Sequence, residues 1–128
     1  MGSDPRSLDA IIRRDAADLR KLKLSRSQVS DRMDSITRRA LEGLGTTVPV
    51  APGLTASVND TRGWLDCPWP HAVRCRKTVT TLCRPETGQT VRWSGLSAHL
   101  IREHGFFQGR GSAFRLDPAE LADILFSF

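Results

Sequence analysis

The chain has 128 residues, which is enough for one compact domain and an appendage. Hydrophobic residues make up 39% and aromatic residues 6%, with no Tyr, so the core must be small. Domains of this size often need a metal, a disulfide or a partner to be stable. The start of the chain does not resemble a secretory signal, and no apolar run is long enough to span a membrane. We therefore expect a cytoplasmic protein.

The charge is basic and unevenly distributed. The formal net charge is +5 and the isoelectric point is about 9.9, which favours acidic partners such as nucleic acid. Between Arg74 and Arg115 there are eight basic residues and two acidic ones, a local charge of +6. Sixteen of the nineteen basic residues are Arg, which suits bidentate contacts to phosphate and guanine, although a GC-rich genome would give the same usage.

Residues 6–44 are predicted to be helical, because no Pro or Gly interrupts them before Gly43. Apolar residues recur at heptad spacing, and eight of the ten core positions are apolar, as in a coiled coil. The two exceptions, Asp15 and Arg26, have opposite charges and would set the register of paired helices. The ten positions are Leu8, Asp15, Leu22, Val29 and Ile36, and Ile12, Leu19, Arg26, Met33 and Ala40. We expect a long coiled-coil-like arm that forms a homodimer through residues 8–40.

A competing interpretation splits this stretch into two helices. Ser25 and Gln28 have the spacing of a capping box, in which each side chain accepts a hydrogen bond from the other residue's backbone N–H. A helix that starts at this box gives a helical hairpin with a break near residue 25. We favour one long helix, and the hairpin is the alternative.

Residues 45–61 have the composition of a flexible linker. They hold two prolines and two glycines among small polar residues, with little to bury. The predicted organisation is therefore a basic helical arm at 1–44, a linker at 45–61 and a small α+β domain at 62–128.

The predicted domain contains a small three-stranded antiparallel sheet. The first strand is expected at 62–67, before a turn with two prolines that exclude a central strand. The second is expected at 73–83, which is rich in Val and Thr, and the third returns at 89–93 after a turn with Pro early and Gly late.

Two short helices complete the predicted domain. Ser94 is the expected cap of a helix that runs to about His104 and stops at Gly105 in the left-handed conformation. Asp117 and Pro118 have the pattern of a second helix start. The apolar face of this last helix is predicted to be Leu121, Ile124, Leu125 and Phe128.

Five potential metal ligands lie within 38 residues of one another: Cys67, Cys75, Cys83, His99 and His104. An odd number of cysteines argues against a closed disulfide framework, and clustered Cys and His in a reducing compartment indicate metal ligation. Zinc takes four ligands in a tetrahedron and binds thiolate and imidazole. The alternative is that the cysteines are packed or exposed thiols and that the two His only cap or pack on their helix.

His99 and His104 have the spacing H-x4-H on a short helix that follows a predicted hairpin. This arrangement resembles a Cys2His2 zinc finger, in which a hairpin supplies two Cys and the next helix two His. The resemblance covers residues 62–105 and implies a ββα-type fold around one structural zinc ion, often with nucleic-acid binding. The spacing departs from the family, because seven residues separate Cys67 from Cys75 and fifteen separate Cys83 from His99.

Strand geometry selects among the three cysteines. If 73–83 is one strand, Cys75 and Cys83 lie roughly 26 Å apart and cannot share an ion. Cys67 and Cys75 flank the Pro-rich turn and can face each other across the mouth of a hairpin. The predicted zinc ligands are Cys67, Cys75, His99 and His104, with Cys83 in place of Cys75 if a bulge breaks the strand, and with His71 as a further substitute.

The sequence does not predict an enzyme. The segment from His99 to His104 has neither the H-E-x-x-H nor the H-x-x-E-H order of metalloprotease helices. Four protein ligands would also leave no position for a catalytic water. No nucleophile and base occur at a recognisable spacing, and no glycine-rich phosphate loop follows a predicted strand.

Tryptophan and arginine interleave in the predicted domain, which suggests a surface for phosphates or single strands. Trp64 and Trp93 are expected in the core, and Trp69, fixed between prolines, is expected at the surface. The predicted nucleic-acid contacts are Arg74, Arg76, Lys77, Arg84, Arg92, Arg102, Arg110 and Trp69.

Two functions are compatible with these features. The first is a zinc-stabilised accessory or regulatory protein that binds nucleic acid, DNA rather than RNA, and that is dimerised by its arm. The second is a protein-interaction adaptor, whose arm docks a partner helix while the zinc domain is a rigid platform. Binding to non-specific DNA that weakens steeply with salt would separate the two, because phosphate contacts are salt-dependent.

Overall fold

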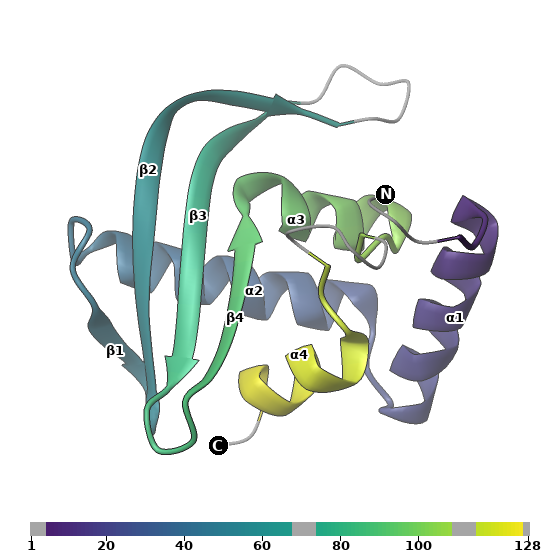
Figure 1. Ribbon diagram of the computed structural model, residues 1–128, viewed down its shortest axis with the longest axis horizontal. Coiled ribbons are helices and arrows are strands. Elements are labelled where there is room, and N and C mark those ends of the chain that lie inside the picture. Colours follow the sequence, from purple (N-terminus) through teal and green to yellow (C-terminus); the bar gives the residue numbers. More distant parts are fainter. Residues whose placement is uncertain (1–4, 68–73, 109–114, 127–128) are drawn as a thin grey trace.

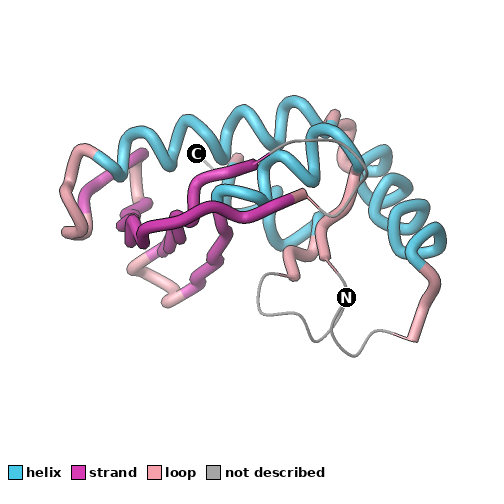
Figure 2. Tube along the Cα trace, turned by 90° about the horizontal axis from the view of Figure 1, so that it is seen from above, coloured by secondary structure: helices cyan, strands magenta, loops and turns pink. Residues whose placement is uncertain are grey.

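A computed structural model describes residues 5–67, 74–108 and 115–126, which form an α+β fold. The four strands make one antiparallel sheet in the order β1-β2-β3-β4 (Figure 1). Figure 2 shows the long helix α2 running beside the strands, with α1 at one end. In chain order the elements are α1 (Leu8–Lys21), α2 (Arg26–Leu41), β1 (Val48–Ala51), β2 (Leu54–Asp66), β3 (Arg74–Arg84), β4 (Gln89–Ser94), α3 (Gly95–His99), the π-helical turn η1 (Leu100–His104) and α4 (Pro118–Leu125). Among the described helices, none has the length and apolar character needed to cross a membrane.

The N-terminal region is two helices, and the predicted long coiled-coil-like arm is wrong. α1 has 14 residues and α2 has 16. Ser25 Oγ accepts from the Gln28 N–H at 3.0 Å, and Gln28 Oε1 accepts from the Ser25 N–H at 2.8 Å. Lys23, with φ of 58°, turns the chain between the helices. The capping box that supported the alternative interpretation therefore ends the heptad pattern at Ser25.

The apolar heptad positions of α2 pack inside this chain. Val29, Met33, Ile36 and Ala40 on α2 are buried in the main core, together with residues of the sheet and of α4. Because these side chains are already covered, the heptad spacing reflects a helix packed on its own sheet and does not describe the seam of a coiled coil.

Asp15, predicted to set the register between two chains, instead forms an ion pair within the chain. Its side chain is 0% exposed and receives two hydrogen bonds from Arg115, Nη1 to Oδ2 at 2.6 Å and Nη2 to Oδ1 at 2.9 Å. Arg115 Nη1 also donates to the backbone carbonyl of Gln108 at 2.9 Å. The bidentate pair attaches α1 to the segment that precedes α4, a hundred residues later in the chain.

The predicted linker at 45–61 is replaced by β1 and the first half of β2, so the sheet has four strands and the predicted three-stranded sheet is wrong. Leu54, Ala56 and Val58 are buried, whereas the intervening Thr55 and Ser57 are only half-buried. This period of two is the pattern of a strand with one face in the core. The average composition of the segment resembles a linker, but the alternation determines its structure.

The two later strands agree with the sequence. The strand predicted at 73–83 is β3, and that predicted at 89–93 is β4. Trp93 is buried as expected, with 2% exposure, and its Nε1–H donates to Thr37 Oγ1 on α2 at 2.9 Å. Thr37 is in turn 2.8 Å from the Thr80 hydroxyl on β3. This chain of polar contacts fixes α2 on the sheet.

β2 and β3 extend past both neighbouring strands as a two-stranded ribbon, defined here as residues 60–66 and 74–78. β4 pairs with β3 only from Val79 to Arg84, and β1 pairs only with the start of β2. Figure 1 shows the ribbon curving over the helices beyond the end of the sheet. Because an isolated two-stranded hairpin is only marginally stable in water, the ribbon needs an anchor.

The two C-terminal helical segments start where the sequence predicts. Ser94 caps the first, which continues from α3 through η1, and Gly105 ends it in the left-handed conformation with φ of 64°. Asp117 caps α4 by accepting from the N–H groups of Ala119 and Glu120 at 3.0 and 3.2 Å. The predicted apolar residues Leu121, Ile124 and Leu125 are buried, and Phe128 lies outside the described residues.

We predict that Asp15→Ala destabilises the protein by about 3–5 kcal/mol. The substitution removes the carboxylate that pairs with Arg115, whose side chain is only 17% exposed, and so leaves a largely buried charge without its ion-pair partner. The exposed Asp9 on the same helix provides the control, since Asp9→Ala removes the same charge outside the core and should cost about 1 kcal/mol or less. Urea denaturation of both variants measures the difference. Equal free energies of unfolding would contradict a structural role for the buried pair.

Candidate metal centre

Three side chains with metal-ligand atoms converge where the ribbon meets the helix that follows β4. The Cys67 sulfur and one ring nitrogen each of His99 and His104 lie within 4.8 Å of one another. Cys67 Sγ is 3.4 Å from His104 Nε2, and the two imidazole rings lie edge to face with centroids 5.5 Å apart. Two ligand atoms on one tetrahedral zinc are roughly 3.3–3.7 Å apart, so little movement is needed to bind an ion.

The π-helical turn η1 explains how both His reach the same site. His99 and His104 are five positions apart, and on an α-helix they would point about 140° away from each other. In η1 the Gly105 N–H reaches back to the carbonyl of Leu100, five residues earlier. This wider turn brings residues five apart toward one face, and π turns of this kind are frequent at functional sites.

Arg102 fixes η1 on α2. Its Nη2 donates to Asp31 Oδ1 at 2.7 Å and to Asp34 Oδ2 at 2.9 Å. The hydrogen bond with Asp34 is the main cause that raises the pKa of the Arg102 guanidinium. Arg102 thus holds the segment that carries both His, and its predicted role as a nucleic-acid contact loses support because two carboxylates already occupy it.

The candidate site lies in a small apolar cluster. Cys67 is 7% exposed and packs with Ile11 of α1, Leu100 of η1 and Phe106. His99 and His104 are half-buried. Such surroundings limit the access of water and strengthen the binding of a cation to thiolate and imidazole.

Cys75 lies beside the group of three but is not part of it. Its Cα partner on β2 is Leu65, and Cys67 is two residues further along, a diagonal relation in which the two residues lie roughly 7–8 Å apart and their Cβ atoms somewhat closer. Burial raises the pKa of the Cys75 thiol, and the charges of Cys67 and Asp34 raise it further. A rotation of its side chain would be needed to reach an ion held by the other three.

Of the two substitute ligands predicted from the sequence, the structure excludes Cys83 and does not describe His71. Cys83 pairs with Thr55 and Thr90 at the far end of β3, and β3 runs unbroken from Arg74 to Arg84. Eight residues of extended strand separate it from Cys75 by roughly 26 Å, so it cannot join the same ion. His71 lies outside the described residues.

The donor set is chemically selective. Thiolate and imidazole are ligands for zinc and other borderline or soft metals, whereas magnesium and calcium take oxygen. Three protein ligands and a water would form an open, catalytic-type site, and a fourth protein ligand would close it into a structural one.

The other predicted nucleic-acid contacts are in several environments. Arg84 is half-buried, and its guanidinium donates to Gln89 Oε1 at 2.8 Å and to the Asp123 carbonyl at 3.1 Å. Lys77 on β3 and Arg92 on β4 are exposed. Arg74 and Arg76 lie in β3, where only their backbone is described, and Arg110 and Trp69 lie outside the described residues.

The expectation that Trp64 is a core residue was wrong. Its side chain is 60% exposed, whereas Trp93 is buried. The signal that bears on its position is Gly63, since a glycine inside a strand often marks a bulge. The aspartates that pair with Arg102 were not predicted either, because Asp31 and Asp34 resemble the solvent-facing acids of an amphipathic helix.

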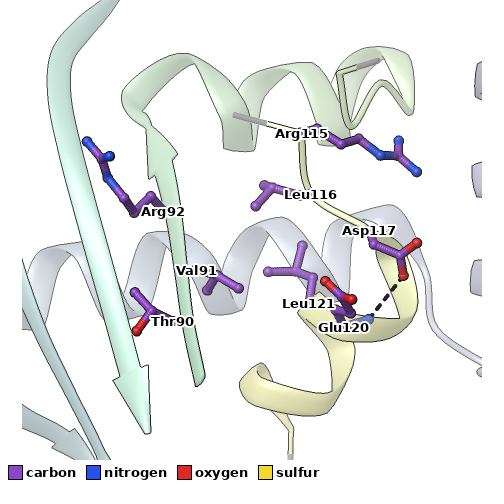
Figure 3. Close-up of a pocket in the computed structure, with 8 residues that line it drawn as sticks. All are labelled: Thr90, Val91, Arg92, Arg115, Leu116, Asp117, Glu120 and Leu121. Atoms are coloured by element: carbon purple, nitrogen blue, oxygen red, sulfur yellow. Dashed lines mark hydrogen bonds between the residues drawn. The ribbon is translucent and has the colours of Figure 1, made fainter. Parts of the chain in front are cut away.

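A separate cavity of about 250 Å³ lies between β4 and α4. Its lining includes Arg92 and Arg115, and Figure 3 shows these two side chains extending away from each other, with Leu116 and Leu121 between them. Because Arg115 is already paired with Asp15, the two guanidiniums do not form a joint anion site.

Comparison with protein-family models gave no match, and neither curated proteins nor solved structures showed significant similarity to this chain. The resemblance to Cys2His2 zinc fingers therefore stays a prediction from spacing and residue type.

Gly105, which ends the helix that carries His104, supplies a test of this local geometry. A Cβ there would lie 2.9 Å from Arg26 Nη1, whereas Gly88, with φ of 74°, has open space around it. We expect Gly88→Ala to cost about 1–2 kcal/mol from left-handed strain alone. Gly105→Ala should cost slightly more, because the exposed and flexible Arg26 side chain must also shift. Thermal unfolding of the two variants compares them, and a larger loss for Gly88→Ala would contradict the role of Arg26.

Proposed function

We propose that this protein is a zinc-stabilised nucleic-acid-binding protein. One observation supports the metal part: Cys67, His99 and His104 hold their ligand atoms within 4.8 Å of one another. Cys75 is the proposed fourth ligand, since it lies diagonally across the ribbon from Cys67. Two thiolates and two imidazoles would form a closed site, so the proposed zinc is structural and the proposed function is not enzymatic.

The proposed role of the zinc is to anchor the ribbon. Cys67 follows directly after the last residue of β2, and His104 ends η1. An ion shared by these residues would attach the free end of a two-stranded ribbon to the helical layer. The free energy of metal binding would then contribute directly to folding, as it does in small zinc domains.

The proposed phosphate contacts lie on the ribbon and on β4. The ribbon contains four basic residues and two acidic ones, and Lys77 and Arg92 are exposed. The proposed contacts are Arg74, Arg76, Lys77 and Arg92. A second group of exposed cations, Arg20 and Lys21, occupies the last turn of α1, where basic side chains stabilise the helix dipole.

The adaptor alternative has less support. It requires the apolar stripe of the N-terminal helices to be free for a partner helix. Val29, Met33 and Ile36 are instead covered by the chain's own core.

We predict one tightly bound zinc ion per chain. Cys67→Ser and His104→Ala should each weaken zinc binding by at least about 100-fold, because changes beside a ligand already cost 10- to 100-fold. Competition with a chromophoric chelator measures the affinity.

The two half-buried cysteines of β3 form a matched pair for the fourth ligand. Cys75→Ser should weaken zinc binding like Cys67→Ser, and Cys83→Ser should leave it unchanged, because Cys83 is at the other end of the strand. An unchanged affinity in Cys75→Ser would assign the fourth position to another ligand. Absence of zinc binding in the unmodified protein would refute the metal proposal.

We also predict salt-dependent binding to duplex DNA. The double change Lys77→Gln with Arg92→Gln, two exposed cations on the same face of the sheet, should reduce the slope of log affinity against log salt by about 2, because two phosphate contacts are lost. Fluorescence anisotropy of a labelled duplex at several salt concentrations gives the slope.

Arg20→Gln with Lys21→Gln removes the same charge from α1 and serves as the control. It should leave the slope nearly unchanged. A larger effect in this control would move the phosphate surface to α1, and no binding even at low salt would refute the nucleic-acid part of the proposal.

A further inference from the structure

Trp64 is a large aromatic side chain kept in contact with water. It is 60% exposed, in a chain whose other described tryptophan, Trp93, is 2% exposed. Burying a ring of this size is one of the larger sources of stability available to a small domain. Because Trp64 is exposed on the ribbon, most of this stabilisation is lost, and the exposure needs a physical explanation.

The local structure of β2 supplies part of the explanation. Asp60 pairs with Thr78 and Trp64 pairs with Arg76, so four steps along β2 are matched by two steps along β3. This register shift is an irregularity of the bulge type, and bulges re-aim the side chains that follow them. The ribbon at this point has also passed beyond β4, which ends opposite Val79. Among the described residues, no third strand therefore lies beside the part of β2 that carries Trp64.

The positions around Trp64 are basic. Its Cα partner across the ladder is Arg76, which occupies the same face of the ribbon, and Lys77, the next residue of β3, is exposed on the opposite face. Arg74 pairs with Asp66, two residues beyond Trp64. An exposed aromatic ring on a strand whose partner strand carries basic residues is a combination that proteins use for unpaired bases, which stack on the ring while their phosphates meet the positive charges.

We propose that Trp64 stacks on a base of single-stranded nucleic acid, with the ribbon's basic residues on the adjoining phosphates. This inference rests on the proposed nucleic-acid function and specifies its partner. A duplex offers phosphates to the same cations, but its base faces are stacked on each other and are not available to the ring. The ribbon therefore prefers a single strand to a duplex of the same length.

The test compares an oligothymidylate with a duplex of equal length at low salt. Trp64→Ala should weaken single-strand binding roughly 5- to 100-fold and duplex binding by less than about 2-fold, because stacking contributes only to the first. Trp64→Phe should retain most of the single-strand affinity, since it keeps an aromatic face. Leu44→Ala, which truncates a side chain that is 92% exposed on the turn after α2, is the control and should change neither affinity.

The outcomes separate this inference from the function on which it rests. Equal loss of both affinities in Trp64→Ala, or no loss of either, overturns the stacking role while duplex binding by the unmodified protein still supports the nucleic-acid function. If the unmodified protein binds neither oligonucleotide, both proposals are wrong. Thermal unfolding of each variant checks the fold, and we expect it to be intact because the substituted side chains are exposed.

Discussion

The meeting of Cys67 and His104, 3.4 Å apart, is the contact that joins the end of the β2–β3 ribbon to the helical layer. β2 and β3 leave their neighbouring strands and continue as a two-stranded ribbon, in which Thr78 is buried and Cys75 is half-buried. An isolated pair of strands is marginal in water, so contacts with the rest of the chain help to hold the ribbon. At the end of that ribbon Cys67 enters an apolar cluster with Ile11 and Leu100. One site thereby gathers the ribbon, η1 and α1, and an ion bound there would add its binding energy to all three junctions.

Several arginines of this chain make internal connections. Arg115 binds the buried Asp15, Arg102 bridges Asp31 and Asp34, and Arg84 reaches Asp123. These pairs differ in their contribution to stability, because the Asp15 carboxylate is fully buried whereas Asp31 is mostly exposed. A net charge of +5 therefore does not translate directly into a binding surface. Among the described residues, exposed cations include Lys77 on the ribbon, Arg92 on β4, Arg20 and Lys21 at the end of α1, and Arg38 and Arg39 at the end of α2.

Much of the fold could be predicted from short-range patterns. The Val- and Thr-rich run gave β3, Ser94 and Gly105 bounded the helix that carries both His, and Asp117 with Pro118 started α4. The same kind of signal was present in Ser25 and Gln28, but the heptad spacing that crosses them favoured one long helix. Alternation in β2 was concealed by its small residues, whose composition is that of a linker. The long helix and the linker were both wrong because a property of a long stretch, its heptad spacing or its composition, was given more weight than a pattern of a few residues.

By itself the sequence determined the donor types of the candidate site and the strand geometry that separates Cys75 from Cys83, because these depend on residue identity and on distances along one element. Tertiary structure decided which sulfur meets which imidazole, that Asp15 belongs to Arg115, and that Trp64 faces water. The physical reason is the distance along the chain over which each interaction acts. Caps and alternation act over a few residues, whereas these pairings join elements far apart in the chain, and even the approach of His99 to His104 requires a π turn that their spacing alone does not specify.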